Sequence, residues 1–152
     1  MKLRPPSLAR PGNREEIRTR LARLSPGDER RWGTMDAPRM LVHITDGLRM
    51  ALGELPCKPK NAPWARIFPL KQLILYWFPW PKEAPTSREL VARPPGPWDD
   101  EMERCVQLLQ RFATGDTPSE WPDHPLFGRM NARQWGILGY RHIDHHLRQF
   151  GK

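Results

Sequence analysis

The sequence NARQWGILGYRHIDHHLRQFG, residues 131–151, decides the fold class and carries most of the chemistry of this chain. Asn131 and Gln134 have the spacing of a capping box, in which two side chains bond free amides at the start of a helix. Apolar residues then recur at helical spacing, at Trp135, Leu138, Ile143, Leu147 and Phe150. Gly151 suits the end of a helix. We therefore predict a helix over residues 132–150.

Three more segments with the same periodicity lie upstream, at residues 13–24, 37–52 and 98–114. Asn13 and Glu16 are spaced as a capping pair for the first, and Asp36 is an N-cap for the second. Acidic residues 99–101 favour the positive end of the third helix. Because no segment alternates with period two and no repeat is visible, we predict an all-α four-helix bundle, one domain over residues 1–152.

The link between the second and third predicted helices is rich in proline. Ten of the 18 prolines lie in residues 56–97, where each one removes an amide donor and restricts the backbone. We expect residues 54–97 to form a long crossover laid over the bundle. It has room for at most one short helix, near residues 67–78, which Pro79 must end.

The composition narrows the class of protein. Lys and Arg number 25 against 17 Asp and Glu, a net charge of +8, yet basic and acidic residues are interleaved, which argues against specific nucleic-acid binding. Residues 67–80, the most apolar stretch, are too few to span a bilayer, and the N-terminus lacks the apolar run of a secretory signal. Two cysteines without CxxC spacing are typical of a reducing compartment. We expect a cytoplasmic protein without membrane partners.

Three of the five histidines lie in the last predicted helix. His142 and His146 are four residues apart, so both can reach one metal ion, while His145 is turned about 100° from His146 toward the surface. Two ligands alone bind a metal loosely, and the third could be His43 or His124. His43 is preferred because it lies beside the apolar stripe of its own helix, which a bundle turns inward.

The segment His142-Ile-Asp-His145-His146-Leu-Arg148-Gln149 resembles the ending of DinB-like metal-binding four-helix bundles. The last helix of that superfamily carries two histidines four apart, followed by an Arg and a Gln, although its better-known members have Arg-Gly-Gln directly after the second histidine. Three further segments, WGTM from residue 32, LVHITDGL from 41 and HPLFGR from 124, resemble an uncharacterised branch of it. The resemblance covers roughly residues 25–152. It assigns the metal ligands to His43, His142 and His146.

The superfamily includes transferases and isomerases that use low-molecular-weight thiols, so the resemblance implies a thiol cofactor as one candidate. Three imidazoles also leave a divalent ion with an open position, as at catalytic zinc sites, where a water or thiol is acidified. Zinc is the first choice of metal, and nickel, copper or iron also suit such ligands. Asp46 and Gln149 are candidate catalytic residues beside the histidines. Cys57 and Cys105 lack the surroundings of a nucleophile.

Three functions from different classes remain open at this stage. The first is a metal-dependent enzyme, a hydrolase or a thiol-dependent transferase acting on a small molecule. The second is a bundle that binds metal without catalysis, whose site would be closed to small molecules. The third is a basic interaction module with incidental histidines. A second copy of the chain is a candidate partner in each case.

Overall fold

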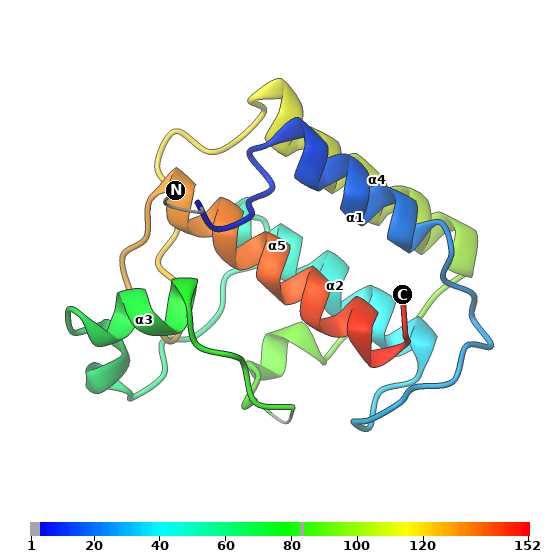
Figure 1. The fold of residues 1–152 in the computed structure, drawn as a ribbon, viewed down its shortest axis with the longest axis horizontal. Helices are drawn as coiled ribbons and strands as arrows, with labels where there is room; N and C mark the ends of the chain where they lie inside the picture. Colours follow the sequence, from blue (N-terminus) through cyan, green and yellow to red (C-terminus); the bar gives the residue numbers. More distant parts are fainter. Residues whose placement is uncertain (1–3, 83) are drawn as a thin grey trace.

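The computed structural model describes residues 4–82 and 84–152. They form five α-helices and two short 3₁₀-helices and, within this part of the chain, no strand beyond one isolated bridge between His124 and Gly128 (Figure 1). In chain order these elements are α1 (Pro11–Leu21), α2 (Ala37–Ala51), η1 (Pro63–Arg66), α3 (Leu70–Tyr76), η2 (Arg88–Leu90), α4 (Trp98–Thr114) and α5 (Ala132–Gln149). The all-α prediction is confirmed. None of the described helices is long and apolar enough to cross a membrane.

The helix starts show where local sequence signals decide the structure. Asp36 caps α2 by accepting a hydrogen bond from the Arg39 amide, and Asn131 and Gln134 form the predicted capping box of α5. The predicted start of the first helix is wrong. Because Pro11 already has the backbone angle of a first helical residue, α1 begins there, and the Asn13 side chain accepts from the Ser7 amide instead.

The helix ends agree with the prediction to within a few residues. The third predicted helix matches α4 at both ends, where Gly115 adopts the left-handed conformation (φ +74°) that closes a helix. By contrast, α1 stops at Leu21, three residues short of the predicted end.

The four longer helices pack against one another. α2 contacts both α4 and α5, and α1 contacts α5 and α4, so that α2 and α5 lie side by side across the molecule (Figure 1). Buried residues from all four form an apolar cluster, which includes Ile17, Leu41, Ile44, Cys105 and Ile143. This packing fixes the register between α2 and α5, the two helices that carry the predicted metal ligands.

The segment between α2 and α4 holds one short α-helix, as expected, and adds η1 and η2. Two arginines attach it to the longer helices. Arg141 of α5 donates to the carbonyls of Ile74 (2.7 Å) and Leu75 (2.6 Å) at the end of α3, where a cation also suits the helix dipole. At the other end, Arg93 pairs with Asp46 of α2 and with Glu101 of α4. The segment is therefore attached to the longer helices at two places, at the end of α3 through Arg141 and after η2 through Arg93.

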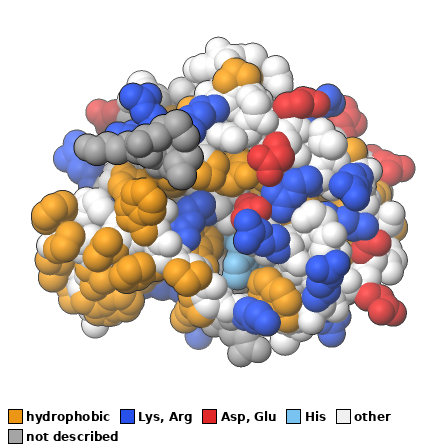
Figure 2. Space-filling view, in the orientation of Figure 1, with side chains coloured by type: hydrophobic (Ala, Val, Ile, Leu, Met, Phe, Trp, Pro, Cys, Tyr) orange, Lys and Arg blue, Asp and Glu red, His pale blue; other side chains and the backbone are white. Residues whose placement is uncertain are grey.

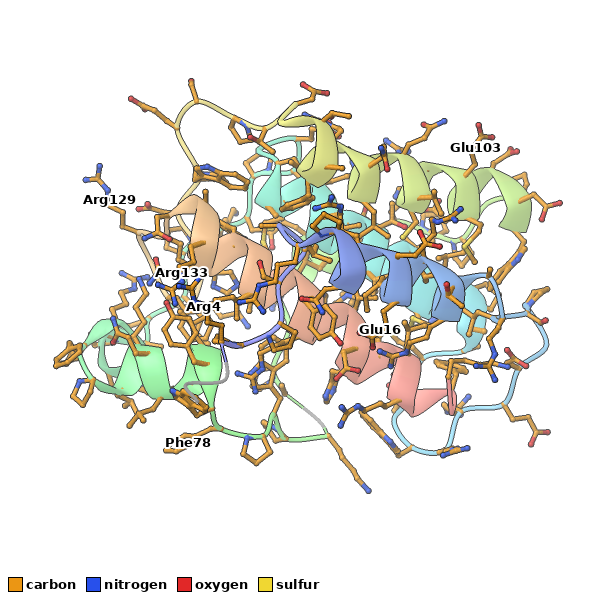
Figure 3. All side chains as sticks on the ribbon, turned by 45° about the horizontal axis from the view of Figure 1, so that its top comes forward. Arg4, Glu16, Phe78, Glu103, Arg129 and Arg133 are labelled. Atoms are coloured by element: carbon orange, nitrogen blue, oxygen red, sulfur yellow. The ribbon has the colours of Figure 1, made fainter. Side chains whose placement is uncertain are left out.

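The surface is unevenly divided. The face over α3 and η1 gathers hydrophobic side chains, whereas charged side chains cover the face over α1 (Figure 2). Side chains on the outer faces, such as Phe78 after α3 and Glu103 on α4, point away from the ribbon (Figure 3). Among the described residues, the large apolar side chains that remain exposed are Trp64, Ile67, Phe68, Trp77, Phe78 and Val91. All of them belong to the crossover.

Candidate metal centre

Three histidines from two helices converge at one point. His43 comes from α2, and His142 and His146 come one turn apart from α5. One ligating nitrogen from each ring lies within 4.8 Å of the others, and the Nε2 atoms of His43 and His142 are 2.9 Å apart. His43 and His146 are buried and His142 is half-buried. The three could hold one metal ion.

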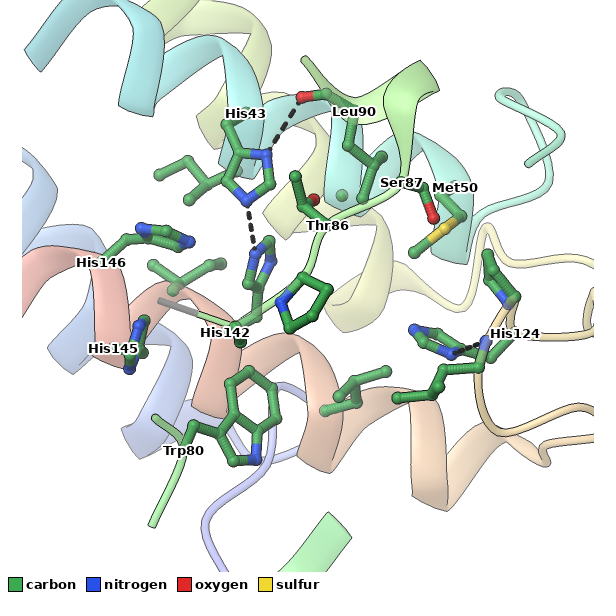
Figure 4. Close-up of a pocket in the computed structure, with 18 of the residues that line it drawn as sticks. His43, Met50, Trp80, Thr86, Ser87, Leu90, His124, His142, His145 and His146 are labelled. Carbon is green, nitrogen blue, oxygen red and sulfur yellow. Dashed lines mark hydrogen bonds between the residues drawn. The ribbon is translucent and has the colours of Figure 1, made fainter. Parts of the chain in front are cut away.

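A backbone carbonyl of the crossover orients His43. Its Nδ1 lies 3.0 Å from the Leu90 carbonyl oxygen of η2 (Figure 4). A carbonyl only accepts, so Nδ1 carries the proton and Nε2 keeps its lone pair. This lone pair faces His142, where a metal ion would lie. Such a hydrogen bond on the far nitrogen is the usual partner of a metal-binding histidine.

A side chain and a second carbonyl orient His146. Its Nδ1 lies 3.1 Å from Oε1 of Gln149, whose Nε2 donates to the Trp32 carbonyl at 2.7 Å. Because the second bond fixes which way the amide points, Oε1 must accept from His146, and Nε2 of His146 is left to ligate. Gly33 makes this contact feasible: its φ is +85°, and a Cβ there would overlap the Gln149 amide.

His142 fits against a glycine of the facing helix. Gly47 lies one turn after His43, and a Cβ built on it would come within 2.9 Å of Nδ1 of His142. The absence of a side chain lets the imidazole lie close to α2. Since His43 presents a bare Nε2, the proton between the two Nε2 atoms belongs to His142 when no metal is bound.

Burial keeps all three imidazoles neutral. Desolvation lowers the pKa of His146 to about 3 and lowers the pKa values of His43 and His142 in the same direction. Neighbouring histidines add to the effect at His142 and His146, because bringing one charge near another is unfavourable. Neutral imidazole is the form that binds metal, so the site favours ligation at ordinary pH.

The three rings face a cavity of about 770 Å³. Its walls come from α2, α5 and the crossover and are mostly apolar, with Trp80, Pro81 and Leu90 on the crossover side. Trp80 lies beside His142, and His124 lies on the other side of the pocket (Figure 4). A volume of this size is in the range of sites for small molecules.

The other predicted residues have different surroundings. His145 is half-buried rather than a surface residue, with its ring 4.8 Å from Trp32. Asp46 is buried, and its Oδ1 accepts from Arg93 (2.9 Å) and Arg49 (3.0 Å) while its Oδ2 accepts from Nε of Arg93 (3.3 Å), so both oxygens serve ion pairs. Gln149 touches a candidate ligand without facing the point where the rings converge.

The two cysteines are unsuited to act as nucleophiles, as the sequence predicts. Burial raises the pKa of the Cys57 thiol to about 11 and that of Cys105 to about 12. Neither thiol carries a useful thiolate fraction at neutral pH.

Sequence comparison provides a family for this chain. Residues 11–152 match the model of a family described as a protein of unknown function, DUF1569. The chain belongs to this family. No curated protein and no solved structure matches it. Because the DUF1569 match spans α1 to α5, the two helices with the candidate ligands lie within the family's domain.

Sequence reasoning missed the groups that orient the histidines in this DUF1569 member. The Leu90 carbonyl and the Trp32 carbonyl are backbone atoms, for which a sequence carries no signal. Gly47 did carry one: a glycine inside an apolar helical stripe costs about 1 kcal/mol relative to alanine, which indicates a packing reason. That reason is the close approach of His142.

Proposed function

We propose that this chain is a divalent-metal-dependent enzyme acting on a small molecule in the cavity beside His43, His142 and His146. The observation that supports it best is the placement of three neutral, pre-oriented imidazoles on the wall of a cavity large enough for an organic substrate. Zinc is the proposed metal, with nickel, copper or iron as alternatives.

The fold supports a related proposal about ancestry. Four longer helices, with a long segment between the second and third, are what the resemblance to a DinB-like four-helix bundle leads us to expect. We propose that the DUF1569 chain belongs to that superfamily. On this view its reaction is a hydrolysis or a transfer from a low-molecular-weight thiol.

A divalent ion held by three imidazoles would supply Lewis-acid chemistry and acidify a water or thiol ligand. The chain's own groups would prepare the site. The Leu90 carbonyl and Gln149 hold the protons on the far nitrogens of His43 and His146, and Trp80 limits access of water to His142. Asp46 acts at a distance by anchoring Arg93 and the crossover wall.

A metal site without catalysis is the competing function. It predicts a closed coordination sphere, whereas the three histidines here line a cavity and the nearby Asp46 is occupied by arginines. A basic interaction module has less support, because a basic interaction surface does not account for a cavity with mostly apolar walls. Duplex nucleic acid should bind weakly, with an affinity that fades by about 200 mM salt.

The test uses protein purified without an affinity tag. Elemental analysis should find close to one transition-metal ion per chain. Cobalt(II) is then substituted, because its visible spectrum reports coordination number, and 2-mercaptoethanol is added. A spectrum that changes with the thiol supports an open, reactive position. A cobalt spectrum that is insensitive to thiol, azide and cyanide would identify a closed structural site and contradict the enzyme proposal.

A further inference from the structure

His124 lies outside the histidine cluster but lines the same cavity. It sits in the loop before α5, where its ring packs against Phe127 (4.9 Å between centroids) and Trp135 (5.4 Å). The loop turns back on itself here, since His124 and Gly128 exchange backbone hydrogen bonds of 2.8 Å in both directions. The ring is therefore held in place by a tight turn below and an aromatic wall beside it.

The hydrogen bonds of the turn fix the proton on the ring. Nδ1 accepts from the backbone amides of Leu126 (3.1 Å) and Phe127 (3.2 Å), so it cannot carry a hydrogen. Desolvation, helped by the charges of Lys60 and Lys71, lowers the pKa of His124 to about 3. The imidazole is consequently neutral at ordinary pH, and its single proton is on Nε2.

This Nε2–H points into the pocket toward the side where His142 lies (Figure 4). Within residues 4–82 and 84–152 no protein group accepts a hydrogen bond from it. A rigid donor with a fixed tautomer, directed into a mostly apolar cavity, is suited to bind an oxygen of a ligand.

The surrounding charges favour an anionic oxygen. Lys60 lines the cavity, with Nζ on the Pro85 carbonyl at 3.3 Å, and Lys71 of α3 donates to the Arg129 carbonyl. Both ammonium groups are close enough to disfavour a charged His124. The same positive potential stabilises a carboxylate placed at Nε2.

The distance to the metal centre sets the length of the ligand. Trp135, which contacts His124, precedes His142 by seven residues on α5, a rise of about 10 Å at roughly 1.5 Å per residue. The walls between are apolar, including Met50, Leu126 and Leu138. A ligand that joins both ends needs a reactive head, an apolar body of about this length and an oxygen tail.

We propose that His124 is the second anchor of the cavity, whose Nε2–H binds the carboxylate tail of an amphipathic substrate with its reactive head at His43, His142 and His146. This inference rests on the proposed function for the identity of the head site. The tail site stands on the His124 geometry alone, so the two can fail separately.

Two substitutions separate the cavity-facing donor from the turn. In His124→Asn the side-chain oxygen can accept the amides of Leu126 and Phe127, as in an Asx turn, but the donor into the cavity is lost. In His124→Gln the side-chain amide reaches the position of Nε2 and keeps that donor. Thermal unfolding midpoints for both variants verify that each is folded.

The zinc-loaded protein is titrated with 8-mercaptooctanoate, 8-mercaptooctanol and octanethiol by calorimetry, the thiol serving as the metal-binding head. We expect the carboxylate to bind about tenfold or more tightly than octanethiol, the range of a charge-assisted hydrogen bond, with the alcohol between. His124→Asn should abolish this preference and leave octanethiol unchanged, while His124→Gln should retain it. Lys60→Gln should weaken the carboxylate alone.

An equal loss for all three thiols in His124→Asn would make His124 structural and overturn the proposal, as would an unchanged preference. A second measurement needs no metal: octanoate added to the metal-free protein should shift the ¹⁵N and ¹H resonances of the His124 Nε2–H, and octanol should shift them less. A chain that binds no zinc but shows this shift would refute the proposed function and retain the tail site. If octanoate leaves those resonances unmoved, the tail site is wrong.

Discussion

The cavity is bounded by two kinds of histidine, and they differ in how they are held. His43, His142 and His146 come from the interiors of α2 and α5, with one ring nitrogen of each within 4.8 Å of the others. His124 comes from a turn, and its Nε2 carries a proton toward the cavity. Both sets are neutral for the same reason, burial, yet His43 and His146 keep a lone pair on Nε2, whereas His124 keeps a proton there. The partner of Nδ1 decides the difference: the Leu90 carbonyl and the Gln149 side-chain oxygen accept from His43 and His146, whereas two backbone amides donate to His124.

The largest expected effect is the loss of zinc affinity when one of the three clustered histidines is replaced. Replacing His43, His142 or His146 with Ala should lower zinc affinity by orders of magnitude, because a pair of imidazoles cannot hold the ion firmly. His145→Ala and His124→Asn are the matched controls and should retain most of the affinity. Competition with a fluorescent chelator measures it. Zinc binding that survives His43→Ala would remove α2 from the site.

Acid should lower the free energy of unfolding of the metal-free protein through buried histidines in both regions. Unfolded histidines take up protons below pH 6.5, whereas His124 and His146 stay neutral in the fold until about pH 3, so the metal-free protein loses stability as pH falls from 6.5. Each such histidine contributes a factor of up to about ten per pH unit to the unfolding equilibrium. Urea unfolding between pH 6.5 and 5, with chelator present, measures the slope.

The variant His124→Asn isolates the contribution of His124 to the pH dependence of the free energy of unfolding. His124→Asn should reduce the proton uptake on unfolding by close to one, while the contribution of His146 remains. A slope that is identical in the variant would mean that His124 is not neutralised by burial.

Gln149 tests the orienting groups of the cluster. Gln149→Leu removes the acceptor for Nδ1 of His146 and should lower zinc affinity roughly 10–100-fold, the usual effect of losing such a partner. Gln149→Glu keeps an acceptor and should retain more of the affinity. If the two variants bind zinc alike, the hydrogen bond does not orient the ring.

The smallest effect concerns the close approach of α2 and α5. Gly47→Ala adds a methyl group 2.9 Å from Nδ1 of His142, so the ring must shift and zinc affinity should fall several-fold, even though alanine favours a helix by about 1 kcal/mol. Gly12→Ala in α1 is the control, because a Cβ there meets nothing within 4 Å. An unchanged zinc affinity in Gly47→Ala would show that His142 has room to spare.

The contrast between the regions also explains what the sequence predicts. Spacing along α2 and α5 is periodic, so His43, His142 and His146 could be placed on inward faces, and Asp36 and Asn131 could be recognised as caps. These signals lie within a few residues of the groups that they govern.

Contacts between distant segments left no such signal. Arg141 binds carbonyls that lie 66 and 67 residues away, and Leu90 bonds His43 across 47 residues. His124 was predicted only as an alternative ligand, since its role follows from the amides of Leu126 and Phe127 in a turn that prolines and glycines permit but do not specify.

The glycine at position 47 has a consequence for sorting related sequences. His43 and Gly47 form the string H-x₃-G on α2, and His142, His146 and Gln149 form H-x₃-H-x₂-Q on α5. Either string alone is too short to be selective, but both are needed to build one site. In a chain that keeps the histidines but has a bulky residue at position 47, that side chain would overlap the ring of His142. We expect the paired strings to mark the family members in which the three histidines can come together as they do here.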